Sequence, residues 1–233
     1  MTSSAGSAQG SPRASTGPLP QGDEAKPVVM SAKQRRRKRI SDTATTLFFE
    51  RGFDAVSIAE IAEKAGVSKM TVTNHFTLKE DLIFDEFDDE LAQVGEALAN
   101  VSSLGDAIDT IERYCIEREH SGGTARALSA QYFPNAWHSF ADMVLASRAL
   151  TQRFHAHYVD MHTVIRAALP AAIPATDATI AAWMLAATVH LVDWWPFEAV
   201  GDGLSDAKIR ERRAVVRARA FAPLRSGADP TAT

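Results

Sequence analysis

Residues 68–76, SKMTVTNHF, combine side-chain types that suit contact with phosphates and base edges. The segment holds short hydroxyls, an amide, an imidazole and a lysine, and it has no carboxylate. Val72 and Phe76 lie four residues apart and share one face of a helix, which leaves the polar set to point outward. Such a face fits a DNA groove, where hydroxyls and ammonium groups reach phosphates and amides read base edges. The alternative is an ordinary helical hairpin with a solvated polar face.

The preceding residues supply the elements that would hold this helix in place. Four apolar residues recur at the spacing of one helical face: Ile58, Ile61, Ala62 and Ala65. Ser57 and Glu60 form a capping box at the start of that helix. Gly66 can adopt the left-handed conformation that ends a helix, and Ser68 can cap the next one. Two short helices joined by a tight glycine turn make a helix-turn-helix.

A longer amphipathic helix is predicted before this motif. Its core face carries Ile40, Ala44, Leu47 and Phe48, and Gly52 is expected to end it. The helix begins within the basic run KQRRRKR at residues 33–39. A basic run often marks only a solvated helix end. Directly before a helix-turn-helix, however, it favours contact with phosphates or entry into the minor groove.

Residues 36–85 resemble the DNA-binding domain of the TetR family of transcriptional regulators. The resemblance rests on an ordered string of residues: Ala44, Leu47 and Phe48, then Gly52 and Phe53, then SIAEIAEKAGVSKMTV, then His75 and Phe76, then KEDL at 79–82. Two positions depart from the family pattern. Thr73 stands where a phosphate-contacting Tyr is usual, and Met70 replaces a small residue. The resemblance also implies that Lys79, at the entrance of a fourth helix, contacts a phosphate.

Charge is divided unevenly along the chain. Residues 31–79 hold ten Lys and Arg against five Asp and Glu, whereas residues 80–120 hold two against thirteen. A basic lobe on an acidic body orients the approach to DNA. The predicted DNA contacts are Arg35, Arg36, Arg37, Ser57, Ser68, Lys69, Met70, Thr71, Thr73, Asn74, His75 and Lys79.

Composition limits the class of protein. The chain has 233 residues, of which 45% are apolar, enough for one large core or two modest ones. Its single cysteine, Cys115, excludes an intramolecular disulfide and a zinc site built on Cys pairs, and it favours a reducing compartment. No uninterrupted apolar run approaches the roughly 20 residues of a bilayer span, and no signal-peptide core is seen at the N-terminus. We expect a soluble cytoplasmic protein with no membrane partner.

The rest of the chain is also predicted to be helical, without a convincing strand. A fourth helix carries an apolar stripe of Leu82, Phe84, Phe87, Leu91, Val94 and Leu98. Further helices are predicted at 106–119, 125–133, 139–169, 177–194 and 206–221, separated by glycines and prolines. The predicted fold is therefore all-α, with about nine helices in all. The predicted domains are a disordered tail at 1–30, a three-helix DNA-binding domain at 31–80, a helical ligand-binding and dimerisation bundle at 81–225, and a disordered tail at 226–233. Met30 is an alternative start.

Large and polar-tipped side chains crowd the C-terminal helices. They predict a pocket for a small apolar ligand, although an aromatic stripe is also how a plain core packs. The candidate lining residues are Tyr114, Trp137, Phe140, His157, Met161, Trp183, His190 and Trp194. The family resemblance implies that an unknown small molecule would shift the fourth helix and release DNA.

Catalytic and metal sites are not favoured by the spacing. His155 and His157 lie two residues apart on a helix and point in different directions, and neither is one turn from His162. A metal site would therefore need another helix. Cys115 has no local His and carboxylate signature, and no phosphate-binding glycine loop occurs. We expect no cofactor and no enzymatic activity.

A broad apolar face near the C-terminus predicts self-association: Ile180, Trp183, Met184, Ala187 and Leu191. The alternative is that this face packs inside the monomer. One recognition helix has little specificity and two half-sites multiply it, so we expect a homodimer on a palindromic operator. The leading interpretation is a ligand-released repressor. The alternatives are a ligand-independent or activating DNA-binding protein of the same fold, and an enzyme with an incidental helix-turn-helix.

Overall fold

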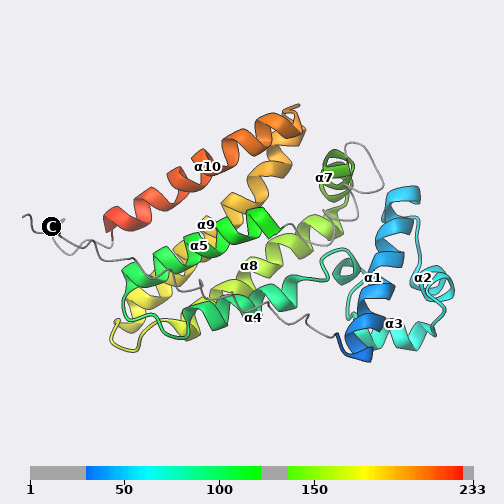
Figure 1. Ribbon diagram of the computed structural model, residues 1–233, viewed down its shortest axis with the longest axis horizontal. Coiled ribbons are helices and arrows are strands. Elements are labelled where there is room, and N and C mark those ends of the chain that lie inside the picture. Colours follow the sequence, from blue (N-terminus) through cyan, green and yellow to red (C-terminus); the bar gives the residue numbers. More distant parts are fainter. Residues whose placement is uncertain (1–29, 122–135, 228–233) are drawn as a thin grey trace, which may run out of the picture.

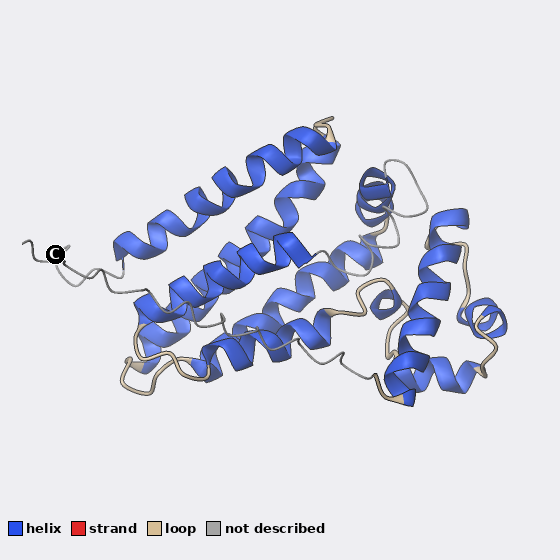
Figure 2. Cartoon of the chain, in the orientation of Figure 1, coloured by secondary structure: helices blue, strands red, loops and turns tan. Residues whose placement is uncertain are grey.

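A computed structural model describes residues 30–121 and 136–227. Within these ranges every regular element is a helix, and no strand occurs, as the all-α prediction requires (Figure 2). The predicted helix at 125–133 lies outside the described residues. So do residues 1–29 and 228–233, which make up most of the two predicted tails.

Three helices form the N-terminal head: α1 (Ala32–Arg51), α2 (Ile58–Lys64) and α3 (Lys69–His75). The predicted stops are confirmed, because Gly52 and Gly66 both have positive φ, at 85° and 65°. The predicted capping box of α2 is also present, since Glu60 donates its backbone N–H to the Ser57 hydroxyl and accepts from the Ser57 N–H. Ser68 caps α3 by accepting from the backbone N–H of Thr71.

The head has its own apolar core between these helices. The side chains that fill it are buried as their spacing predicts: Ile40, Ala44, Leu47, Phe48, Phe53, Ile61, Ala62, Val72 and Phe76. The helices α2 and α3 have seven residues each and would not be stable in isolation. Burial of these aliphatic and aromatic side chains stabilises them in the folded head. The tight packing sets the angle at which α3 is presented.

The fourth helix begins later than predicted. A 3-10 turn, η1 (Glu80–Leu82), follows the head, and four residues separate it from α4 (Phe87–Leu98). The predicted apolar positions before Phe87 are nevertheless buried, including Leu82 and Phe84. A periodic stripe does not distinguish a helix from a compact turn that buries the same side chains, which is why the predicted start is wrong.

The C-terminal body contains α5 (Leu104–Ser121), α7 (Ala136–Ala146), α8 (Arg148–Ala168), α9 (Ala175–Gly201) and α10 (Asp206–Gly227). The single helix predicted at 139–169 is in fact two. Ser147 is extended and caps α8 by accepting from the N–H of Leu150. The predicted stop at Pro196 is wrong too, because α9 continues through that proline to Gly201. Buried contacts on α9 outweigh the one backbone hydrogen bond that a proline forfeits.

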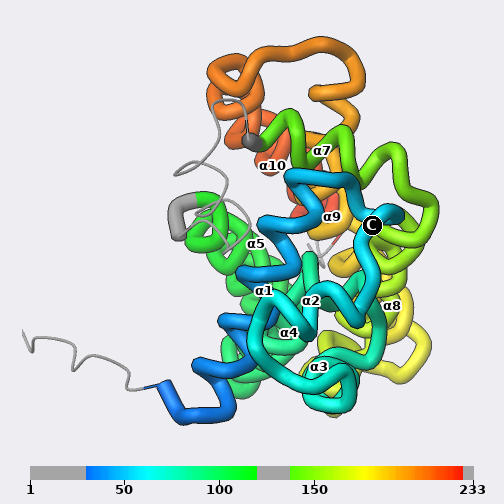
Figure 3. The backbone as a smooth tube through the Cα atoms, turned by 90° about the vertical axis from the view of Figure 1, so that its right-hand side faces the viewer, coloured from blue at the N-terminus to red at the C-terminus, as the bar shows by residue number. Residues whose placement is uncertain are grey.

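The head lies at one end of the molecule, and α4, α5, α8, α9 and α10 extend away from it as a longer bundle (Figure 1). Figure 3 views the same arrangement from the head end. Among the described helices, α9 alone is long and apolar enough to cross a membrane by length and composition. However, α9 packs within the bundle and carries Asp193 in a partly buried ion pair, as a core helix does.

Candidate DNA interface and interior cavity

The outward face of α3 is free of carboxylates and open to solvent. Lys69, Met70, Thr73 and Asn74 are exposed, while Val72 on the opposite face is completely buried. Met70 is the most exposed of the large apolar residues at 68%. This face therefore presents an ammonium, an amide and a thioether to a DNA groove.

Several of the predicted hydroxyl contacts also have local structural roles. Ser57 and Ser68 act as helix caps, and the Ser68 hydroxyl lies 2.8 Å from the Thr71 hydroxyl. Thr73 donates to the backbone oxygen of Met70 at 3.1 Å. A hydroxyl whose proton is donated within the helix has no proton left to donate to a phosphate oxygen. Lys69 and Asn74 are therefore the stronger hydrogen-bond donors on this face.

The basic run contributes positive charge beside the end of α3. Arg36 is exposed, and Arg35 donates to the backbone oxygen of Met30. Burial lowers the pKa of His75, and the charges of Lys33, Arg36 and Arg37 lower it further. These cations therefore already gather around the C-terminal end of the recognition helix before any duplex arrives.

Arg37 lies inside the protein more than the other predicted contacts do. Its guanidinium donates to the backbone oxygens of His75 and Asp85, at 2.5 and 3.1 Å. It also lies 4.3 Å from the centre of the Phe76 ring and 3.7 Å from the carboxylate of Asp88. Arg37 thus connects the end of α3 to the segment that leads into α4.

Lys79 is likewise held by the head. Its ammonium donates to the backbone oxygen of Phe53 at 2.6 Å and lies 4.3 Å from the centre of the Phe53 ring. Burial lowers the pKa of Lys79. An ammonium has three donors, so a phosphate contact remains open to it. In the folded head, this contact joins the loop between α1 and α2 to the segment that follows α3.

The head and the body meet at a polar junction. Ser41 of α1 donates to the Asp85 carboxylate at 2.5 Å, and Arg153 of α8 pairs with Asp81 of η1 at 2.7 Å. Burial raises the pKa of Asp85 to about 6, although the Ser41 hydrogen bond opposes the shift. The junction therefore ties the segment between η1 and α4 to both domains.

A cavity of about 470 Å³ lies in the body, between α4, α5, α7, α8, α9 and α10. Two of the predicted lining residues, Trp137 and Phe140, do face it. The other six are not among its described lining residues: Tyr114, His157, Met161, Trp183, His190 and Trp194. Met161 and His157 are core residues with no exposed surface, whereas Trp183 is 46% exposed. Aromatic content alone did not distinguish core, cavity and outer surface.

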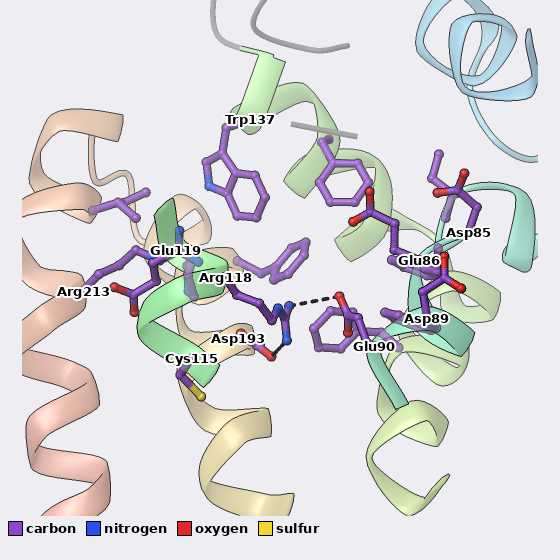
Figure 4. Close-up of a pocket in the computed structure, with 18 of the residues that line it drawn as sticks. Asp85, Glu86, Asp89, Glu90, Cys115, Arg118, Glu119, Trp137, Asp193 and Arg213 are labelled. Carbon is purple, nitrogen blue, oxygen red and sulfur yellow. Dashed lines mark hydrogen bonds and ion pairs between the residues drawn. The ribbon is translucent and has the colours of Figure 1, made fainter. Parts of the chain in front are cut away.

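The cavity contains a guanidinium held between two carboxylates. Arg118 of α5 lies 3.3 Å from the carboxylate of Glu90 on α4 and 2.8 Å from that of Asp193 on α9 (Figure 4). His157 approaches Glu90 at 3.1 Å, and the Tyr158 hydroxyl donates to Asp193 at 2.9 Å. This cluster joins four helices of the body around the cavity wall.

Sequence reasoning missed this cluster, although a signal for it exists. Glu90 lies three residues after Phe87 and four before Val94, which is the buried face of α4. Arg118 similarly follows Tyr114 by four and Cys115 by three. A charge at a core position of an amphipathic helix needs a partner from another element. Which element supplies that partner is known only once the fold is known.

The predicted apolar face of α9 points away from the core. Ile180, Trp183, Met184, Ala187 and Leu191 are all exposed, so the alternative that they pack inside the monomer is wrong for the described structure. Nearby, His190 contacts His155 of α8, with ring nitrogens 2.7 Å apart. In the part of the chain that the structure describes, no three His, Cys, Asp or Glu side chains converge as metal ligands.

The fold and the head define an all-helical protein with an N-terminal helix-turn-helix. Residues 40–85 match the family of bacterial regulatory proteins described as the tetR family. The N-terminal domain of this chain is therefore similar to the DNA-binding domain of that family.

The chain is similar to known proteins, among them two curated relatives and one solved structure. The transcriptional repressor KstR2 of Rhodococcus jostii is 40% identical over 53 residues, which are 23% of this chain and 26% of that protein. The putative mycofactocin biosynthesis transcriptional regulator MftR of Mycobacterium tuberculosis is 36% identical over 64 residues, 28% of this chain and 32% of that protein. The chain thus matches less than a third of either relative's length. The structure titled SmeT-Triclosan complex aligns over 86% of this chain and 95% of that one, with 20% identity and a TM-score of 0.50, which concerns the fold alone.

Proposed function

We propose that the protein is a sequence-specific, DNA-binding transcriptional regulator that acts as a homodimer. The observation that carries this proposal is the outward face of α3, where Lys69, Met70, Thr73 and Asn74 are exposed and no carboxylate occurs. Amides and ammonium groups on a rigid, capped helix are suited to base edges and phosphates. The name of one relative, a transcriptional repressor, favours repression over activation, and the expected location is the cytoplasm.

Dimerisation is proposed through the exposed face of α9, with the neighbouring surface of α8. Val159 of α8 is 52% exposed and lies between His155 and His162, which contact His190 and Trp183 of α9. The exposed apolar residues of α9 are Ile180, Trp183, Met184 and Leu191. A contiguous apolar surface of this kind favours an isologous contact between two copies. The two recognition helices would then meet half-sites about 34–36 Å apart on a palindromic operator.

Release of DNA by a small molecule is the regulatory part of the proposal. The cavity volume of about 470 Å³ lies in the range of small-molecule pockets. Its presence favours ligand control over the alternative of a domain filled by its own aromatics. Glu90 of α4 belongs to the cavity wall, and Asp85, five residues earlier, belongs to the junction with the head. A ligand that displaces Glu90 would therefore act on the segment that positions the heads.

The test is selection of bound duplexes from a random DNA pool by the purified protein, at two salt concentrations. An enriched palindrome that survives the higher salt would support a dimeric sequence reader. Binding that vanishes with salt and selects no sequence would contradict the proposal, since phosphate contacts alone behave in that way. Asn74→Ala should change or abolish the selected sequence, whereas Lys79→Ala should weaken all duplexes alike and reduce the salt slope by about one.

A further inference from the structure

The charge of the cavity is one-sided. The described residues that line it include seven carboxylates and three guanidiniums. Two of the carboxylates have partners outside this set, since Glu119 pairs with Arg217 and Asp206 contacts His138. Four of the seven carboxylates come from the segment at the start of α4, Asp85, Glu86, Asp89 and Glu90, and Figure 4 shows them along one wall with Arg213 on the opposite side. The carboxylates therefore concentrate on the wall formed by α4, where Asp89 is exposed, and this wall favours a cationic guest over an anionic one.

The central guanidinium does not cancel this excess. Arg118 already pairs with two carboxylates, Glu90 and Asp193, and the Asp193 oxygen accepts a further hydrogen bond from Tyr158. An anionic guest that sought Arg118 would have to separate it from Glu90 and leave that carboxylate in a partly buried site. Separating such a pair leaves a carboxylate without its cation away from water, which costs free energy and disfavours binding of the anion. A cationic guest can instead approach Glu90 from the cavity side.

Aromatic rings form another part of the cavity wall. Phe197 lies 5.1 Å from Trp137, 5.8 Å from Phe140 and 5.2 Å from Phe154, measured between ring centroids. These ring faces carry partial negative charge and attract cations as well as apolar surface. A wall of aromatics that faces a wall of carboxylates combines the two groups that recognise an organic cation with an apolar body.

We propose that the effector of this protein is an organic cation with an aromatic or otherwise bulky apolar body, held between the aromatic wall and the carboxylates at the start of α4. The proposal rests on the proposed ligand control and names its ligand class. A cation beside Glu90 competes with Arg118 for that carboxylate. It would therefore weaken the contact between α4 and α5 and reach the head through the segment that contains Asp85.

The test compares probes that differ in the sign of their charge. Tetraphenylphosphonium and tetraphenylborate carry the same four phenyl groups around a positive and a negative centre. Binding of each to the full chain is measured by titration calorimetry without DNA. The pair phenyltrimethylammonium and benzenesulfonate is measured as well, so that an oversized probe cannot produce a false negative. We expect the cation to bind at least about tenfold more tightly than the anion in one or both pairs.

Two variants assign the binding to this cavity. Asp89→Asn removes an exposed lining carboxylate and should weaken cation binding by about threefold, in the range of a solvent-exposed ion pair. Glu96→Gln is the matched control, because Glu96 is exposed on the same helix but does not line the cavity. Trp137→Leu should weaken the cation further by removing an aromatic face. Equal binding of both signs, a preference for the anion, or cation binding that ignores both lining variants would overturn the proposal.

The result is separable from the test of DNA binding. Cation binding with the expected variant pattern, in a protein that selects no duplex, would leave the ligand class standing and remove the regulatory function. A selected palindrome, in a protein that binds neither cation, would support the DNA-binding function and contradict the proposed ligand class. When both succeed, the cation should also release the selected duplex, and Asp89→Asn should require about threefold more of it.

Discussion

Arg37 of α1 donates a hydrogen bond to the backbone oxygen of His75, the last residue of α3, across 2.5 Å. The carbonyls at the end of a helix have no partner within the helix, and this guanidinium supplies one. The same side chain reaches the oxygen of Asp85 at 3.1 Å. One arginine of the basic run therefore fixes the end of the recognition helix to the segment leading into α4.

This relationship predicts different outcomes for two neighbouring arginines. Arg37→Ala should lower the free energy of unfolding by about 1–2 kcal/mol, because two backbone oxygens lose a charged donor. Arg36→Ala, at an exposed position, should change it by less than about 0.5 kcal/mol but weaken binding to every duplex. Urea unfolding and DNA titrations of both variants provide the comparison. Equal stability of the two variants would mean that the internal contacts of Arg37 contribute nothing.

Asp85 predicts a pH dependence of stability. Burial raises its pKa from 3.8 to about 6 in the folded protein. Between about pH 4 and pH 6 the folded state keeps a proton that the unfolded chain releases, so the free energy of unfolding falls as pH rises through this window. The loss is on the order of 3 kcal/mol above about pH 6. Asp85→Asn should remove this decline, as measured by denaturant unfolding across that range.

The control for this variant is Asp89→Asn, which removes an exposed carboxylate close by. It should keep the decline of the parent protein. Asp85→Asn should be more stable than the parent above about pH 6 and similar to it below about pH 4, since the introduced side chain still offers an amide oxygen to Ser41. A decline that persists in Asp85→Asn would assign the pH dependence to another group.

The head could be predicted in detail because its signals are local. Ser57, Glu60, Gly66 and Ser68 each act within a few residues of their own position, through caps and a left-handed turn. Such signals do not depend on distant parts of the chain. The boundaries of α2 and α3, and the end of α1 at Gly52, therefore follow from the order of residues.

The cavity and the junction depend on residues far apart in the chain, which periodicity does not pair. Glu90 and Arg118 appear in the sequence as charges on acidic helices, and their contact needs the packing of α4 against α5. The break at Ser147 was missed because apolar spacing continues across it. A serine can also lie within an unbroken helix, so the sequence leaves both possibilities open.

The cluster around Arg118 predicts a large loss of stability on substitution of Arg118, part of which a second substitution should restore. Arg118→Met should lower the free energy of unfolding by about 2–3 kcal/mol, because Glu90 and Asp193 are left without their cation in a partly buried site. Arg113→Met, exposed on the same helix, should cost much less. Adding Asp193→Asn to Arg118→Met should restore part of the loss. An additive double variant, with no recovery, would show that the two side chains are not coupled.

The outer face of α9 predicts the assembly state. Met184 is 45% exposed in the chain and lies in the middle of the proposed dimer surface, so Met184→Glu would bring two like charges together across a two-fold contact. We expect the dimer dissociation constant to rise by about 30-fold or more, as for a central apolar contact. Val215→Glu is the matched control, because Val215 is 51% exposed on α10, outside that surface. Sedimentation velocity of both variants should give a monomer for the first and a dimer for the second. If both remain dimeric, two copies of this chain meet through a different face.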